Sequence, residues 1–235
     1  MTTKEVLATL KTYGNENTKK IHLTHGAREP VFGVKVEDLK KVLKQLKNNQ
    51  QLALELYDTG NSDAMYLAGL AADGAKMTKK QLQQWAEKAY WSWLSEYIVP
   101  WVSTENPQGF ELALEWIDSK KENIASTGWG TINVIISNKP DEELDIKKLK
   151  ALLGRVEKEI HTAPNRVRYT MNAFVIGLGC FVKELNKEAM ATAKKIGVVM
   201  VDMNGTSCKT PFAPDYIKKV MDKGKLGAKR KNIKC

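Results

Sequence analysis

Hydrophobic residues recur along most of the chain with the spacing that places them on one face of an α-helix. Between residues 36 and 47 the spacing is i, i+3, i+4, i+7, and the apolar positions are Leu39, Val42, Leu43 and Leu46. Lysines occupy the opposite face of this segment. Comparable segments of ordinary helix length begin near residues 48, 61, 78, 93, 107, 121, 141, 165, 187 and 213. The pattern predicts about ten helices joined by short loops.

Residues near the ends of these segments refine the prediction. Thr78 precedes a periodic segment and has the side chain of a good N-cap. Pro100 lies inside a helical pattern and lacks a backbone N–H, so we expect a kink or break after Tyr97 or Val99. The one convincing strand candidate, residues 197–203, lies between a helix and a loop. We interpret it as an extended segment outside any sheet.

Many helices without an alternating strand–helix rhythm indicate an all-α fold. We predict a superhelical array of antiparallel helix pairs of the HEAT-like or ARM-like kind, with pairs beginning near residues 35, 61, 93, 121 and 165. Residues 1–223 would form this single domain, and residues 224–235 a basic tail. In such an array the second helix of each pair lines a concave surface, which could hold a duplex.

The charge of the chain is concentrated at its C-terminal end. The net charge is +10, and residues 218–235 hold eight basic residues and one acidic residue, which leaves +3 for the first 217 residues. One interpretation is a solvated, disordered terminus. The other is an arm that neutralises phosphates, and a disordered arm can become ordered on a polyanion.

Other features of the sequence exclude several classes of protein. No apolar run reaches the length of a membrane span, and the first residues lack the pattern of a secretory signal, so we expect a cytoplasmic protein. The three cysteines and three histidines lack metal-ligand spacing, and the cysteines are expected to be free thiols. We expect neither a metal site nor a cofactor.

Three stretches together resemble the DNA alkylation repair family, the AlkD-like alkylpurine DNA glycosylases built from HEAT-like repeats. They are EPVFGVKVEDLKK at 29–41, LALELYDTGNSDAMYLAGL at 52–70 and QLQQWAEKAYWSWLSEYIV at 81–99. The likeness covers most of residues 29–137 and continues more loosely toward the C-terminus. It implies a helical array that binds DNA and excises cationic N3- or N7-alkylpurines.

The family chemistry uses a tryptophan, an aspartate one turn later and an arginine on the following helix pair. Trp93 matches the tryptophan, but the position four residues later is Tyr97. The nearby carboxylate is Glu96, which a helix would turn about 100° away from Tyr97. The stretch 124–133, where relatives present Trp-Arg-Arg, contains Trp129 and no arginine. These departures fall on the residues that carry the chemistry.

The resemblance and the residue types give two sets of candidate site residues. For catalysis they are Trp93, Glu96 and Tyr97, with Glu96 either a solvated helix residue or a surrogate base that positions water. For DNA binding they are Trp129, Arg166, Arg168, Lys209, Lys229, Arg230 and Lys231. The two arginines near 165 are expected at a helix start, where amides and the helix dipole favour phosphate, although ordinary surface arginines explain them as well.

Two functions remain open at this point. We expect a monomeric protein whose partner is double-stranded DNA, alkylated or structured. The first is a DNA-binding alkylation-repair protein with glycosylase activity on cationic alkylpurines. The second is a non-enzymatic module of the same fold, which binds structured DNA or a protein partner. A helical scaffold without any affinity for nucleic acid is a third alternative.

Overall fold

A computed structural model of the chain describes residues 1–46 and 49–234. The first half contains α1 Thr3–Thr12, α2 Glu16–Thr24, α3 Val36–Leu43, α4 Gln50–Asp58, α5 Ser62–Ala71, the short η1 Gly74–Lys76, α6 Lys79–Lys88, the π-helix η2 Leu94–Ile98 and α7 Val99–Glu105. The second half contains α8 Gly109–Trp116, α9 Glu122–Asn138, η3 Asp141–Glu143, α10 Ile146–Glu159, α11 Asn165–Phe181, η4 Lys183–Leu185, α12 Asn186–Ile196 and α13 Ala213–Asp222. No strand occurs in the described ranges, which confirms the all-α prediction.

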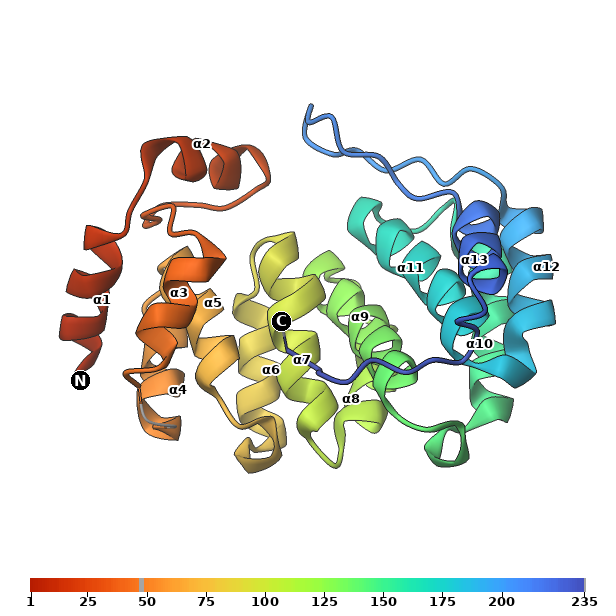
Figure 1. Ribbon diagram of the computed structural model, residues 1–235, viewed down its shortest axis with the longest axis horizontal. Helices are drawn as coiled ribbons and strands as arrows, with labels where there is room; N and C mark the ends of the chain where they lie inside the picture. The colour runs from red at the N-terminus through yellow and green to blue at the C-terminus, as the bar shows by residue number, and fades with distance from the viewer. Residues whose placement is uncertain (47–48, 235) are drawn as a thin grey trace.

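The helices lie side by side in an arc that begins at α1 and ends at α12 and α13 (Figure 1). One layer of the array contains α5, then η2 together with α7, then α9, α11 and α13. Each member of this layer contacts the next. α4 packs on α5, and α8 packs on α9. The predicted pair register is therefore wrong near residues 61 and 121, because α5 and α9 are each partnered by the preceding helix, whereas the pair predicted to begin near residue 165 is formed by α11 and α12. Periodicity shows which face of a helix is buried but not which neighbour covers it.

Helix ends follow the capping chemistry that the sequence indicated. The Thr78 side chain accepts from the amide of Gln81, and the Gln81 side chain accepts from the Thr78 amide, which forms a capping box. Asn49 and Asn61 cap α4 and α5 in a similar way through their side-chain oxygens. Two helices, α1 and α2, were not predicted.

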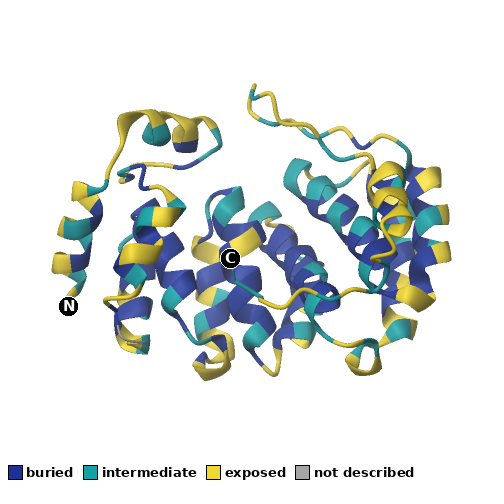
Figure 2. Cartoon of the chain, in the orientation of Figure 1, coloured by how far each residue is buried: buried dark blue, intermediate teal, exposed yellow. Residues whose placement is uncertain are grey.

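The interior consists of two hydrophobic clusters. The first consists mainly of residues from α1 and α3–α7, with a few from α8 and α9, and contains most of the tryptophans, including Trp85, Trp91 and Trp101. The second joins α8–α13 and contains Trp129 and Phe174. Figure 2 shows that buried residues are concentrated in the central helices of the arc, whereas much of α2 and of the loop after α12 is exposed.

Two segments outside the helices bear on the site. Residues 197–203 are extended without strand pairing, as predicted, and belong to a loop that projects from the array between α12 and α13. The C-terminal tail leaves α13 and runs back across the array toward α7 (Figure 1). In the described part of the chain no helix is long and apolar enough to cross a membrane.

Candidate nucleic-acid interface

The break predicted at Pro100 is a π-turn between two helical stretches. The Val99 amide donates to the carbonyl of Leu94, five residues earlier. Pro100 has no amide to donate and is accommodated in the first turn of α7. Gly130 of α9 allows close packing here, because a Cβ at that position would lie 3.0 Å from Cγ of Pro100.

This irregular segment presents a row of aromatic rings. Tyr97 and Trp101 have ring centroids 6.2 Å apart, and Tyr66 of α5 lies 5.6 Å from Trp93 and 6.0 Å from Trp101. Tyr97 is 42% exposed, and Trp93 is partly exposed. Such rings offer flat apolar faces to a ligand on this side of the array.

Two adjoining pockets share Trp93 and Tyr97. The first, here called the polar pocket, has a volume of about 490 Å³ and is lined by His25, Gly26, Tyr90, Trp91, Ser92, Trp93, Glu96, Tyr97, Glu122, Asn165, Arg166, Tyr169, Met203, Asn204, Cys208 and Lys209. The second, the aromatic pocket, has a volume of about 410 Å³ and is lined by Tyr66, Trp93, Tyr97, Trp101 and the tail residues Arg230, Asn232, Ile233 and Lys234. Both volumes are within the range of small-molecule sites, ~300–1,000 Å³.

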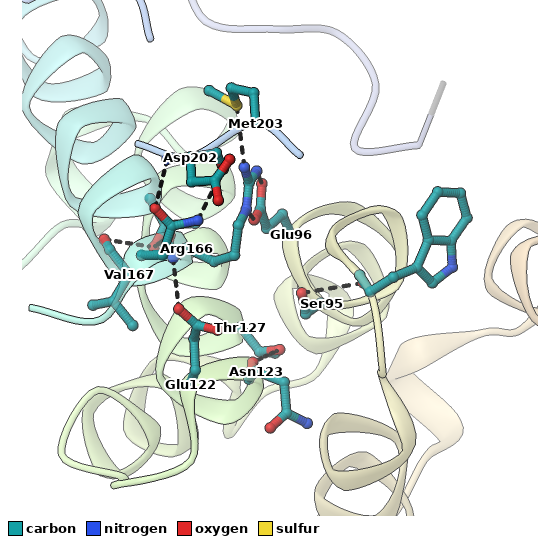
Figure 3. Close-up of polar contacts among 12 residues, drawn as sticks. Ser95, Glu96, Glu122, Asn123, Thr127, Arg166, Val167, Asp202 and Met203 are labelled. Atoms are coloured by element: carbon teal, nitrogen blue, oxygen red, sulfur yellow. Dashed lines mark hydrogen bonds and ion pairs between the residues drawn. The ribbon is translucent and has the colours of Figure 1, made fainter. Parts of the chain in front are cut away.

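Glu96 is not a solvated helix residue, because its side chain is buried in a two-point ion pair with Arg166 (Figure 3). Arg166 donates from Nε to Oε1 and from a terminal nitrogen to Oε2 of Glu96, each at 2.7 Å. Burial raises the pKa of the Glu96 carboxyl, and the hydrogen bonds and charge of Arg166 oppose that rise. Both carboxylate oxygens are therefore engaged.

The start of α11 is also occupied by groups of the protein. The backbone N–H of Arg166 donates to Oε1 of Glu122 at 2.7 Å (Figure 3). Asn165 exchanges two hydrogen bonds with the backbone of Asp202. A terminal nitrogen of Arg166 lies 3.4 Å from the sulfur of Met203. Carboxylates of the protein thus occupy the Arg166 side chain and the Arg166 amide at this helix start, and the predicted phosphate contact of Arg166 stays a prediction.

Trp129 was predicted to face DNA, and the structure buries it completely. Its ring packs 5.1 Å from that of Phe174 inside the second core cluster. Gly128 and Gly130 flank it, and a Cβ on Gly128 would lie 2.8 Å from the carbonyl oxygen of Ala113. These two glycines thus let α9 pack closely on its neighbours.

The basic tail is anchored to the array. Lys229 donates to the carbonyl of Ile136 at 2.9 Å and pairs with Asp141 at 2.7 Å, so its predicted contact with DNA is not supported. The Arg230 amide donates to the carbonyl of Ser137 at 2.7 Å. These contacts exclude a freely solvated terminus for this part of the tail.

For the other four candidate cations, contact with DNA stays a prediction. The side chains of Arg230 and Lys231 are exposed beside the aromatic pocket, and exposed Lys209 lines the polar pocket. Arg168 is partly buried on α11, and its Nε has no hydrogen-bond partner within the described chain. Cys180, expected to be inert, is buried, and burial raises the pKa of its thiol to about 11.

Sequence reasoning missed Asp63, which fixes the turn formed by Phe32, Gly33 and Val34. Its buried carboxylate accepts from all three backbone amides of this turn, at 2.6–3.2 Å. Gly33 has a φ of +76°, and a Cβ there would lie 2.3 Å from the Lys19 amide nitrogen. In the sequence, a polar residue in the first turn of a helix indicates only a capping role. The amides that Asp63 binds are about 30 residues away, so no local pattern indicated them.

The pH dependence of stability is expected to reflect His22, which is buried against Trp91 and Trp93. Burial lowers the pKa of His22, and the charge of Asp63 only partly opposes this. The unfolded chain therefore binds the proton more tightly, so the free energy of unfolding should fall as pH drops below about 6.5. Urea unfolding at pH 7.5 and 5.5 should show a smaller loss in His22→Phe than in the wild type. Equal losses would contradict this role.

Residues 6–197 match the family model described as DNA alkylation repair enzyme. The chain belongs to the DNA alkylation repair enzyme family. It is 35% identical to the uncharacterised protein Lin0241 of Listeria innocua over 220 residues, which are 91% of this chain and 95% of that protein. It is also 35% identical to the uncharacterised protein Lmo0209 of Listeria monocytogenes over 222 residues, 92% and 96% of the two chains.

A solved structure places this family member among the HEAT-like repeat proteins. The two chains superpose with a TM-score of 0.93 at 36% identity, and the match covers 100% of each. That structure belongs to what is described as a new family of proteins related to the HEAT-like repeat DNA glycosylases, with affinity for branched DNA structures. The HEAT-like fold and the family predicted from sequence are both confirmed.

Proposed function

We propose that this protein binds branched DNA through the side of the array that carries the two pockets, and that it does not excise bases. The observation that carries the proposal is the buried ion pair between Glu96 and Arg166 beside Trp93. Excision of an alkylpurine needs a carboxylate that can position water at the sugar. Here the carboxylate nearest Trp93 in sequence binds an arginine instead.

The other carboxylate of the polar pocket supports the same conclusion. Glu122 lines this pocket, and its Oε1 accepts the Arg166 amide. Each acidic side chain among the lining residues thus has a basic or amide partner within the fold. The polar pocket fits a binding surface better than a hydrolytic centre.

Charge and likeness support DNA as the ligand. The chain carries a net charge of +10, and Lys209, Arg230 and Lys231 are exposed at or next to the pockets. The solved relative of the same fold is described as having affinity for branched DNA structures. Neutralised phosphates provide most of the affinity of such surfaces and make it dependent on salt.

The proposal predicts tight junction binding without chemistry. We expect a three-way junction to bind at least about 10-fold more tightly than a linear duplex of equal length, a ratio worth about 1.4 kcal/mol. Duplexes containing N3- and N7-methylpurines should release no more base than they do with the Glu96→Gln, Trp93→Ala double variant. Anisotropy titrations and chromatography of released bases measure the two quantities.

Salt dependence identifies the cations that take part. Lys231→Ala should reduce the slope of log K against log salt by about 0.9 if its ammonium contacts one phosphate. Lys147→Ala is the matched control, since this exposed lysine is on α10, which contributes no residue to either pocket. Equal affinity for junction and duplex, or base release above that of the double variant, would overturn the proposal.

A further inference from the structure

The aromatic pocket has a floor of four aromatic side chains from two neighbouring elements. Tyr66 comes from α5, whereas Trp93, Tyr97 and Trp101 come from the segment around η2 and α7. Three of the ring pairs have centroids between 5.6 and 6.2 Å apart. The π-turn and Pro100 lie between Trp93 and Trp101. The result is a cluster of flat faces around a volume of about 410 Å³.

The C-terminal tail forms the remaining wall of this pocket, and contacts at both ends hold it in place. On one side, the Arg230 amide donates to Ser137. On the other, Lys234 donates to the carbonyl of Ala72 and pairs with Glu105 at 2.9 Å, while Ile233 packs on the first core cluster. The tail therefore bridges the C-terminal and N-terminal halves of the array directly over the aromatic residues.

Between these anchors the tail presents polar groups that remain available. The Asn232 amide and the Arg230 guanidinium form no hydrogen bond to another described residue. The Arg230 guanidinium lies 5.5 Å from the centroid of the Phe181 ring. An amide and a guanidinium are planar donors suited to the edge of a nucleobase.

We propose that the aromatic pocket receives one unpaired nucleobase from the branch point of bound DNA. The base stacks on the rings of Trp93 and Tyr97, and its polar edge faces Asn232 and Arg230 of the tail. This inference rests on the proposed function, since it names what the protein recognises at a branch. The tail thereby acts as part of the binding site and not only as a source of positive charge.

Energetics favour an unpaired base over one taken from intact duplex. Removing a base from the stack costs a few kcal/mol, and this cost is least for a base that is already unpaired. Stacking of one base on an aromatic side chain changes affinity by about 5- to 100-fold when that side chain is truncated. A pocket of this kind therefore distinguishes a branch with an exposed base from a continuous duplex.

The test compares two three-way junctions that differ at a single position. One has an unpaired adenine at the branch point, and the other has a tetrahydrofuran abasic residue in its place. We expect wild-type protein to bind the adenine junction about 5- to 100-fold more tightly in anisotropy titrations at one salt concentration. Tyr97→Leu should lose most of this preference while still binding the abasic junction. Asn232→Ala should reduce it by a smaller factor.

Tyr13→Leu is the matched control, because Tyr13 follows α1 and lines neither pocket. It should keep the full preference, and thermal unfolding should show that each variant is folded. Equal wild-type affinity for the two junctions, or an unchanged preference in both Tyr97→Leu and Asn232→Ala, would overturn the inference and leave junction binding intact. Failure of both junctions to bind better than a duplex would instead overturn the proposed function.

Discussion

Replacement of Glu96 by alanine is expected to lower the free energy of unfolding by about 3–5 kcal/mol, because it removes one partner of a buried ion pair. The Glu96 side chain is 4% exposed and that of Arg166 is 25% exposed, so water only partly replaces the lost carboxylate. Arg166 would keep its charge while losing both hydrogen bonds to Glu96. Urea unfolding followed by circular dichroism at pH 7.5 measures the change.

A solvent-exposed ion pair provides the control for this result. Glu115 pairs with Lys79 at 2.7 Å, and both side chains are more than half exposed. Glu115→Ala should therefore change the free energy of unfolding by less than about 1 kcal/mol. The double variant Glu96→Ala, Arg166→Met should recover part of the lost stability, because no unpaired charge then remains. Similar losses in Glu96→Ala and Glu115→Ala would show that the buried pair does not stabilise the fold.

Asp63→Ala is expected to cost about 3–5 kcal/mol, since it leaves the amides of Phe32, Gly33 and Val34 without their acceptor. These amides belong to the turn that connects the N-terminal helices to the array. Their desolvation is not compensated once the carboxylate is gone. The same substitution also removes the carboxylate near His22, whose Nδ1 lies 3.9 Å from Oδ1 of Asp63.

Asp58→Ala is the control for that variant, because Asp58 pairs with Lys88 on an exposed surface. We expect a change below about 1 kcal/mol there. Hydrogen exchange adds a local measurement, since the amides of Phe32, Gly33 and Val34 should lose protection in Asp63→Ala. Retained protection of all three amides would show that another group satisfies them.

Several features of the fold could be predicted from the local sequence. The periodic segments gave most helices, Thr78 gave a helix start, and Pro100 gave an irregularity that the structure forms as a π-turn. α1 and α2 were missed because few of their residues are buried: Val6 and Leu10 in α1, and only His22 in α2. A short helix with so small an apolar face gives little periodic signal.

The site was only partly accessible by the same reasoning. Trp93 and Tyr97, which the family resemblance indicated as candidate site residues, both line the two pockets. Trp129, which the same resemblance indicated, is buried, because the surrounding glycines bring α9 close to α7 and α8. A tryptophan in an apolar helix has the same sequence signal on either side of that helix.

The sequence by itself determined that this protein is an all-α member of the DNA alkylation repair enzyme family, with an aromatic segment around Trp93 and a basic C-terminus. Periodicity, caps and proline act within a few residues, so they can be read from neighbouring positions. Only the tertiary structure decided that Glu96 binds Arg166 and that the tail closes the aromatic pocket. Those contacts join residues 70 or more positions apart, and their partners are set by how the helices stack.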